Sequence, residues 1–307
     1  MVAALLANTG IALTKFLAFA LTQSSSMLAE AIHSVADSGN QLLLLLGGRK
    51  ARKEATPEHP FGFGRERYIY SFIVAIVLFS VGGLFALYEA YHKWHEVHAH
   101  PGDLGQLDGR WWWVPLAVLG AAIVMESFSF RTAIRESNRD RGTASWPEFV
   151  RRAKAPELPV ILLEDLAALL GLTFALLGVG LTLITREPIF DVIGTGLIGV
   201  LLVVVAVILA LETKSLLLGE AATPEAQRRI RAAIEGSDGI EGLIHMKTLH
   251  LGPDELLVAA KIAVTASDSA ADVARAIDLA EAAIREVDPA ARVIYLEPDL
   301  RRTHVPS

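Results

Sequence analysis

Long apolar segments constrain this chain more than any other feature of its sequence. A helix needs about 20 residues to cross the hydrocarbon core of a bilayer. Six segments reach about that length, at 2–22, 27–47, 69–92, 112–134, 158–184 and 190–217. With 52% hydrophobic residues, the chain is too apolar for a soluble enzyme unless the excess is concentrated in such segments. We therefore expect an α-helical membrane protein with a six-helix transmembrane bundle.

The positive charges predict how this bundle is oriented. Arg49, Lys50, Arg52 and Lys53 follow the second segment, and a run of Arg residues follows the fourth. Cytoplasmic loops carry an excess of Lys and Arg, so these two loops, and with them both termini, are expected in the cytoplasm. We expect the plasma (inner) membrane of a prokaryote. No removable signal peptide is expected, because the first apolar segment lacks a basic region before it.

Residues 219–307 have the mixed polarity of a soluble domain. Their pattern predicts a helix at 224–235, strands at 243–251 and 255–265, a helix at 269–287 and a strand at 291–298. Either Ser267 or Ser269 can cap the second helix. We therefore expect two domains, a transmembrane domain at 1–218 and a small cytoplasmic α+β domain of ferredoxin-like type at 219–307.

Charge and cysteine content exclude several kinds of function. The net charge of −6 comes largely from the last domain and makes nucleic acid an unlikely partner. The chain has no cysteine, so disulfides and thiolate metal sites are excluded. Any metal must be held by imidazole, carboxylate, carbonyl or water.

The second segment carries a stripe of polar residues inside the expected membrane span. Their spacing, by steps of 3, 4, 3 and 1, places Glu30, His33, Asp37, Asn40 and Gln41 on one face of a helix. His33 and Asp37 are four residues apart, the spacing at which side chains of successive turns can hold one ion. A hydrogen-bonded pair that only joins helices is the alternative.

The fifth segment carries two adjacent acids, Glu164 and Asp165, in an apolar run. Unpaired carboxylates are costly there, and we expect no basic partner in the central part of any helix. A metal ion or protonation is then required, and alternation between the two is antiport chemistry. The alternative is that both acids mark an interfacial helix start. A row of small residues, Ala167, Gly171 and Ala175, predicts close packing of this helix.

Four further acids lie in or near apolar segments, and we favour packing roles for them: Glu89, Glu126, Asp191 and Glu212.

Five parts of the sequence form recognisable motifs: SMLAEAIHSVADSGNQ, HPFGFGRERY, GGLFALYEA, the acidic fifth segment and SLLLGEAATPE. They resemble the cation diffusion facilitators, and within them the branch that includes zinc transporter nine. The resemblance covers nearly the whole chain. It implies divalent metal transport by proton antiport in a homodimer whose soluble domain joins the protomers.

The resemblance also implies a transport site of two residues four apart in each of the second and fifth helices. These carry over to His33, Asp37 and Asp165. The fourth position holds Ile161, which cannot bind metal, so Glu164 is expected to replace it. An adjacent residue on a helix points about 100° away, and the resemblance alone does not settle whether Glu164 is a direct ligand.

Other metal sites of the family are poorly kept here. His59 matches a loop motif, but Phe63 stands where a second histidine is often found, and we interpret His59 as an ordinary loop residue. Polar residues near the family's soluble-domain sites are His245, His250, Glu297 and Asp299. We expect no bound metal at these positions and interpret the domain as a dimerisation module.

Together these patterns predict a transporter rather than an enzyme, with no resident cofactor and with metal, protons and lipid as its partners. One imidazole and two or three carboxylates suit Zn²⁺, and also Mn²⁺, Co²⁺ or Fe²⁺. Two alternatives remain open: a non-transporting membrane metal sensor or scaffold, and an intramembrane metallo-hydrolase.

Overall fold

The computed structural model describes residues 2–100, 109 and 111–301. They divide into two compact units, one formed by residues up to 49 and 69–214, the other by 50–68 and from 215 onward. The second unit therefore includes the loop at 50–68 as well as the soluble tail. The functional boundary at 218/219 stays a prediction.

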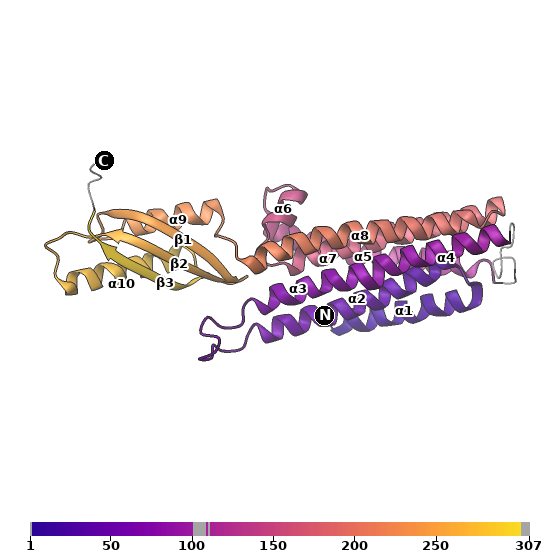
Figure 1. The fold of residues 1–307 in the computed structure, drawn as a ribbon, viewed down its shortest axis with the longest axis horizontal. Helices are drawn as coiled ribbons and strands as arrows, with labels where there is room; N and C mark the ends of the chain where they lie inside the picture. The colour runs from indigo at the N-terminus through magenta and orange to yellow at the C-terminus, as the bar shows by residue number, and fades with distance from the viewer. Residues whose placement is uncertain (1, 101–108, 110, 302–307) are drawn as a thin grey trace. The chain divides into compact units, whose positions relative to one another are not determined.

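The first unit is a bundle of long helices that run beside one another (Figure 1). It contains α1 (Val2–Thr22), α2 (Ser25–Lys50), α5 (Val114–Arg141), α7 (Glu157–Thr185), α8 (Ile189–Leu218) and a continuous run of α3 (Glu66–Val77), η1 (Leu78–Leu84) and α4 (Phe85–Ala99). The six expected segments are thus all helical. The connection between α4 and α5 lies mostly outside the described residues.

Four of these helices, within the described residues, are long and apolar enough to cross a membrane: Glu66–Ala99, Val114–Arg141, Glu157–Thr185 and Ile189–Leu218. In α1 the apolar stretch found is shorter, Thr9–Thr22, and α2 is interrupted by its polar stripe. The chain is a helical membrane protein, and the count of six spans remains a prediction.

A π-helical turn interrupts the third expected segment, which the sequence pattern did not predict. It spans Leu78–Leu84 and contains the pair Gly82 and Gly83. A Cβ atom on Gly82 would lie 3.2 Å from Leu202 and 3.9 Å from Nδ1 of His33. The missing side chains therefore let the turn approach both α8 and the polar stripe of α2. Such turns are frequent at functional sites.

A second unpredicted element is the short helix α6 (Trp146–Arg152), in a connection expected to be a charged loop. Ser145 caps it by accepting a hydrogen bond from the backbone N–H of Glu148. Phe149 is buried in a small cluster with Ala133 and Leu162. This contact fixes α6 against α5 and α7.

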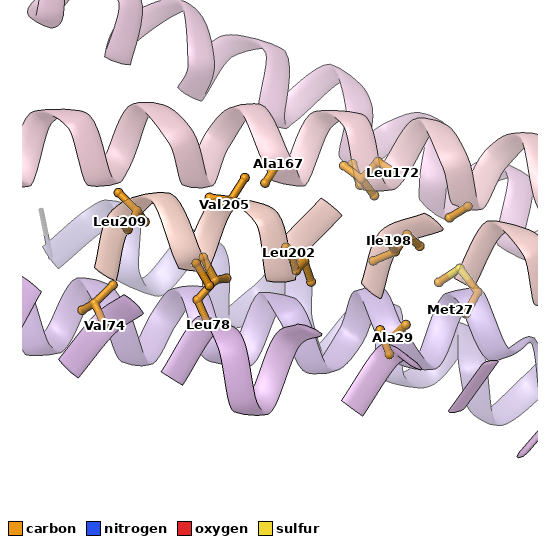
Figure 2. Close-up of a cluster of buried hydrophobic side chains, with 14 of the residues drawn as sticks. Met27, Ala29, Val74, Leu78, Ala167, Leu172, Ile198, Leu202, Val205 and Leu209 are labelled. Atoms are coloured by element: carbon orange, nitrogen blue, oxygen red, sulfur yellow. The ribbon is translucent and has the colours of Figure 1, made fainter. Parts of the chain in front are cut away.

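The core of the first unit is apolar and lies between α2, α3, α7 and α8 (Figure 2). Its largest fully buried side chains include Met27, Leu78, Leu172, Ile198, Leu202 and Leu209. Ala167, Gly171 and Ala175 are buried along α7, which confirms the close packing predicted from the row of small residues.

The second unit contains α9 (Pro224–Glu235), β1 (Gly242–Gly252), β2 (Glu255–Ala263), α10 (Ala270–Val287) and β3 (Ala291–Asp299). Strand order is β1-β2-β3, with β1 and β2 antiparallel and β2 and β3 parallel. The α+β class is confirmed. The described sheet has three strands, one fewer than the βαββαβ arrangement of a ferredoxin-like fold.

The loop at 50–68 packs on the turn between β1 and β2, inside the second unit. A Cβ atom on Gly64 would lie 2.9 Å from the carbonyl oxygen of Leu251 and 3.1 Å from Cα of Gly252. Arg67 forms an ion pair with Asp254 at 2.9 Å. The loop that joins α2 to α3 is therefore attached to the sheet domain.

Candidate metal site

His33 and Asp37 lie together on α2, as their spacing predicts. Nε2 of His33 is 3.5 Å from Oδ2 of Asp37, and the side chains are 1% and 15% exposed. Both ring nitrogens of His33 and Oδ1 of Asp37 are buried without a hydrogen-bond partner. Buried polar atoms are normally satisfied. Two facing side chains with unused polar atoms therefore form the centre of the candidate site.

Glu164 faces this helix from α7. It is 6% exposed, and its Oε1 accepts a hydrogen bond of 2.6 Å from Nδ2 of Asn40. Asn40 follows His33 by seven residues, two helical turns along the same face. Glu164 is therefore attached to the polar stripe of α2, one turn beyond Asp37.

Asp165 faces a different neighbour. Its Oδ2 accepts a hydrogen bond of 2.9 Å from the hydroxyl of Ser129 on α5, which packs along α7. The two adjacent acids thus point to α2 and α5 respectively, as the rotation of about 100° per residue requires.

The four predicted ligands are not gathered into one cage. Within the part of the chain that the structure describes, no three His, Asp or Glu side chains are close enough to hold a metal ion. The structure brings His33 to Asp37 and Glu164 to Asn40, and leaves Asp165 on Ser129. Closing a complete shell would require α7 to move or its side chains to change rotamer.

One expectation from the sequence is wrong. A basic residue does lie inside the bundle: Lys15 of α1 is 1% exposed, with Nζ 3.1 Å from Oε2 of Glu30 and 2.7 Å from the hydroxyl of Ser34. The signal was a single Lys within an apolar segment, and it could have been found from position alone. Lys15 forms an ion pair with Glu30. Glu164 and Asp165 instead accept hydrogen bonds from Asn40 and Ser129.

Asp191 has the packing role expected of it. The residue is 3% exposed at the start of α8. Its carboxylate accepts hydrogen bonds from the hydroxyls of Ser24 and Ser25 and from the backbone N–H of Ser25. It therefore caps the N-terminus of α2 and joins α2 to α8.

Glu126 is half-buried on α5, three residues before Ser129 and so on the same side of that helix. This places Glu126 on the side of α5 whose Ser129 contacts Asp165 of α7.

Two of the polar candidates of the soluble tail, Glu297 and Asp299, pair with a lysine of the neighbouring strand. Lys261 lies 3.0 Å from Glu297 and 3.1 Å from Asp299. The hydrogen bond with Glu297, and to a smaller extent that with Asp299, raises the pKa of Lys261 above its usual value. His250 is buried and lies 3.4 Å from the carbonyl oxygen of Gly252. In the loop, the ring of His59 packs against Phe63 at 4.7 Å.

The sequence of this chain is similar to those of known proteins. Residues 1–218 match the family of cation efflux transmembrane domains. Human proton-coupled zinc antiporter SLC30A9, mitochondrial, is 34% identical over 242 residues, which cover 78% of this chain and 41% of the relative. Metal tolerance protein C4 of Arabidopsis thaliana is 26% identical over 251 residues, covering 81% and 53%.

A bacterial relative is similar over most of its length. Magnetosome protein MamB of Magnetospira sp. (strain QH-2) is 24% identical over 264 residues, which cover 83% of this chain and 80% of that protein. The matched part of the SLC30A9 relatives is less than half of their length. These matches confirm the resemblance to the branch of zinc transporter nine, and the chain belongs to the cation efflux, or cation diffusion facilitator, family.

Proposed function

We propose that this protein moves a divalent transition metal, zinc first among them, across a membrane in exchange for protons. His33 and Asp37 bind the ion from α2, and Asp165 and Glu164 complete its shell from α7. Membership in an efflux family favours transport over the metallo-hydrolase alternative. The SLC30A9 relatives are named as proton-coupled zinc antiporters, which supports zinc as the transported ion and protons as the exchanged ion.

The observation that carries the proposal is the separation of 3.5 Å between Nε2 of His33 and Oδ2 of Asp37. Zinc bonds nitrogen and oxygen ligands at about 2.0–2.2 Å with tetrahedral angles, which places two ligand atoms about 3.4 Å apart. The observed separation is too long for a strong hydrogen bond and fits one ion held between the two atoms. The unused polar atoms of both side chains support the same interpretation.

Proton exchange follows from the same groups. A neutral imidazole and ionised carboxylates bind a metal, and protonating them weakens the binding. Three ionised carboxylates without a metal ion would be costly in the membrane. Protons are therefore the natural replacement for the departing ion. Alternating access would come from rocking helices around the site.

We further propose that six helices span the plasma (inner) membrane of a prokaryote with both termini in the cytoplasm, and that the second unit holds a homodimer together. The charged loops after α2 and α5 support the orientation.

Metal flux tests the proposal. Purified protein in sealed vesicles should move zinc in the direction opposite to the protons. Zinc entry should therefore make the lumen more alkaline, and zinc exit should make it more acidic. Vesicles without protein and vesicles with the Asp37→Asn variant are the controls. Zinc binding without flux would favour the sensor or scaffold alternative. The absence of both zinc binding and zinc flux would overturn the proposal.

A further inference from the structure

Among the residues that the structure describes, Lys15 is a buried cation of the bundle that the proposed transport cycle does not use. It is among the largest fully buried side chains of the protein. Its ammonium reaches Oε2 of Glu30 at 3.1 Å and the hydroxyl of Ser34 at 2.7 Å. A charge inside a membrane bundle persists only with a partner, and here that partner is an acid on the helix that carries His33 and Asp37.

The Lys15–Glu30 pair lies directly beside the candidate metal ligands. Glu30 precedes His33 by three residues and so lies on the same face of α2, and Ser34 follows His33 in sequence. A change in this pair therefore changes the electrostatic potential where the metal would bind.

Glu30 uses only one of its two oxygens. Oε2 is paired with Lys15, whereas Oε1 is buried without a hydrogen-bond partner. This second oxygen points at α7, where a Cβ atom on Gly171 would lie 2.7 Å from it. Glu30 is thus a carboxylate of α2 with one unused oxygen, which faces α7, the other helix that supplies metal ligands.

We propose that Lys15 is a specificity-determining residue that holds Glu30 out of the metal shell and fixes the net charge of the transport site. The inference rests on the proposed function of that site. Manganese and other hard ions favour additional carboxylate oxygens, whereas zinc is satisfied by four ligands that include imidazole. An ammonium that occupies Glu30 therefore favours zinc over manganese and keeps the site from binding its ion too tightly to release it.

Two single substitutions and their combination test the proposal, because the two single changes should alter metal affinity in opposite directions. Lys15→Met frees Glu30 and should tighten manganese binding about tenfold, with a smaller gain for zinc. Glu30→Gln leaves the ammonium without its counter-charge and should weaken both metals about tenfold. The double variant restores the balance of charge and should bring both dissociation constants back to within about threefold of the unaltered protein. The measurement is titration of the purified full-length protein in detergent with Zn²⁺ and with Mn²⁺ at one pH.

Two controls separate charge from packing. Lys15→Arg keeps the positive charge and should keep the preference for zinc. Lys93→Met removes a half-buried lysine of α4 that pairs with Glu96 at 2.9 Å and should leave both constants unchanged. Thermal unfolding of each variant reports whether it is folded.

The proposal fails if both single variants weaken the two metals equally and the double variant is no better, because the pair then only joins helices. It also fails if Lys15→Arg loses the preference for zinc while remaining folded. If the unaltered protein binds zinc and transports it in either of these cases, the proposed function survives. Absence of zinc binding in the unaltered protein would overturn both.

Discussion

Nδ2 of Asn40 donates a hydrogen bond of 2.6 Å to Oε1 of Glu164, joining the polar stripe of α2 to the acidic turn of α7. This contact bears on the one ligand that departs from the family pattern. Glu164 either exchanges Asn40 for the metal when the ion arrives, or remains an interhelical partner while another group completes the shell. The two roles lead to different metal affinities after substitution.

Glu164→Gln should weaken zinc binding at least tenfold if Glu164 is a ligand, because the amide has no charge to offer the ion. The hydrogen bond from Asn40 can still be accepted by the amide oxygen of Gln, so the helix contact is kept. Calorimetric titration in detergent measures the change. Glu157→Gln, in the first turn of the same helix, is the matched control, and an unchanged constant for Glu164→Gln would assign Glu164 to packing.

Ile161→His, added to Glu164→Gln, should partly restore zinc binding. The new imidazole stands four residues before Asp165 and rebuilds the spacing that lets two side chains of one helix share an ion. Because imidazole is softer than carboxylate, the rescued protein should prefer zinc over manganese more than the parent does. Failure of the double variant to bind better than Glu164→Gln would show that Asp165 does not face the ion.

Asp37→Ala and Asp165→Ala should each abolish zinc flux in sealed vesicles while the protein stays folded, because each removes a ligand from a site with few to spare. Ser129→Ala, which removes only the hydrogen bond to Asp165, should retain most of the flux. Flux at the unaltered rate in either aspartate variant would exclude that residue from the site.

Local pattern predicted the elements well, since it depends on spacing along one helix or strand. The stripe from Glu30 to Gln41 and the small row on α7 both follow from helical periodicity. In the tail, the predicted strand at 243–251 and the predicted helix at 224–235 match β1 and α9 to within a residue. The α+β class of the tail follows from that order of elements, whereas the strand order and the parallel pairing of β2 with β3 come from the structure.

Contacts between helices could not be predicted in the same way. Nothing in the spacing of Glu164 and Asp165 says that one faces Asn40 and the other Ser129, because the rotation of α7 is set by packing. The π-helical turn next to His33 depends on Gly82 and Gly83 meeting α8. The partner of Lys15 is likewise a matter of tertiary structure, although its cost in the membrane was visible from sequence.

Gly178→Ala should destabilise the bundle, because a Cβ atom there would lie 2.9 Å from the carbonyl oxygen of Phe190 and 3.4 Å from Cα of Gly194. Backbone atoms cannot move aside as a flexible side chain can, so α7 and α8 must separate. Gly180→Ala is the matched control two residues along the same helix, with nothing within 4 Å of the new atom. It should be neutral or slightly stabilising. Thermal midpoints in detergent compare the two, and equal midpoints would contradict the close approach.

Ser269→Ala should weaken the start of α10, and Ser267→Ala should not. Ser269 and Asp272 form a capping box, each side chain bonding to the other's backbone; losing such a cap costs about 1 kcal/mol. The hydrogen bond from the Ser269 side chain, followed by that from its backbone, lowers the pKa of Asp272 below its usual value. Hydrogen exchange of the α10 amides in the full chain measures the effect.

The pH dependence of this cap has a definite sign. A lowered pKa in the folded state stabilises the fold above the unfolded pKa, and the contribution is lost as pH falls through the folded value. The difference in exchange between the unaltered protein and Ser269→Ala should therefore persist at neutral pH and shrink in acid. A difference that grows as pH falls below 4 would contradict the capping box.

Removing residues 219–307 should weaken dimerisation and lower zinc flux without eliminating zinc binding, because every proposed ligand lies upstream. The cut also exposes the loop at 50–68, which loses the contact of Gly64 with Gly252 and the ion pair of Arg67 with Asp254. Asp254→Asn in the full chain removes only that exposed ion pair, whose value is small, and is the control for the loop. Sedimentation and zinc titration in detergent measure the two outcomes separately. Loss of all zinc binding on truncation, with Asp254→Asn still binding, would show that the ligands were assigned to the wrong unit.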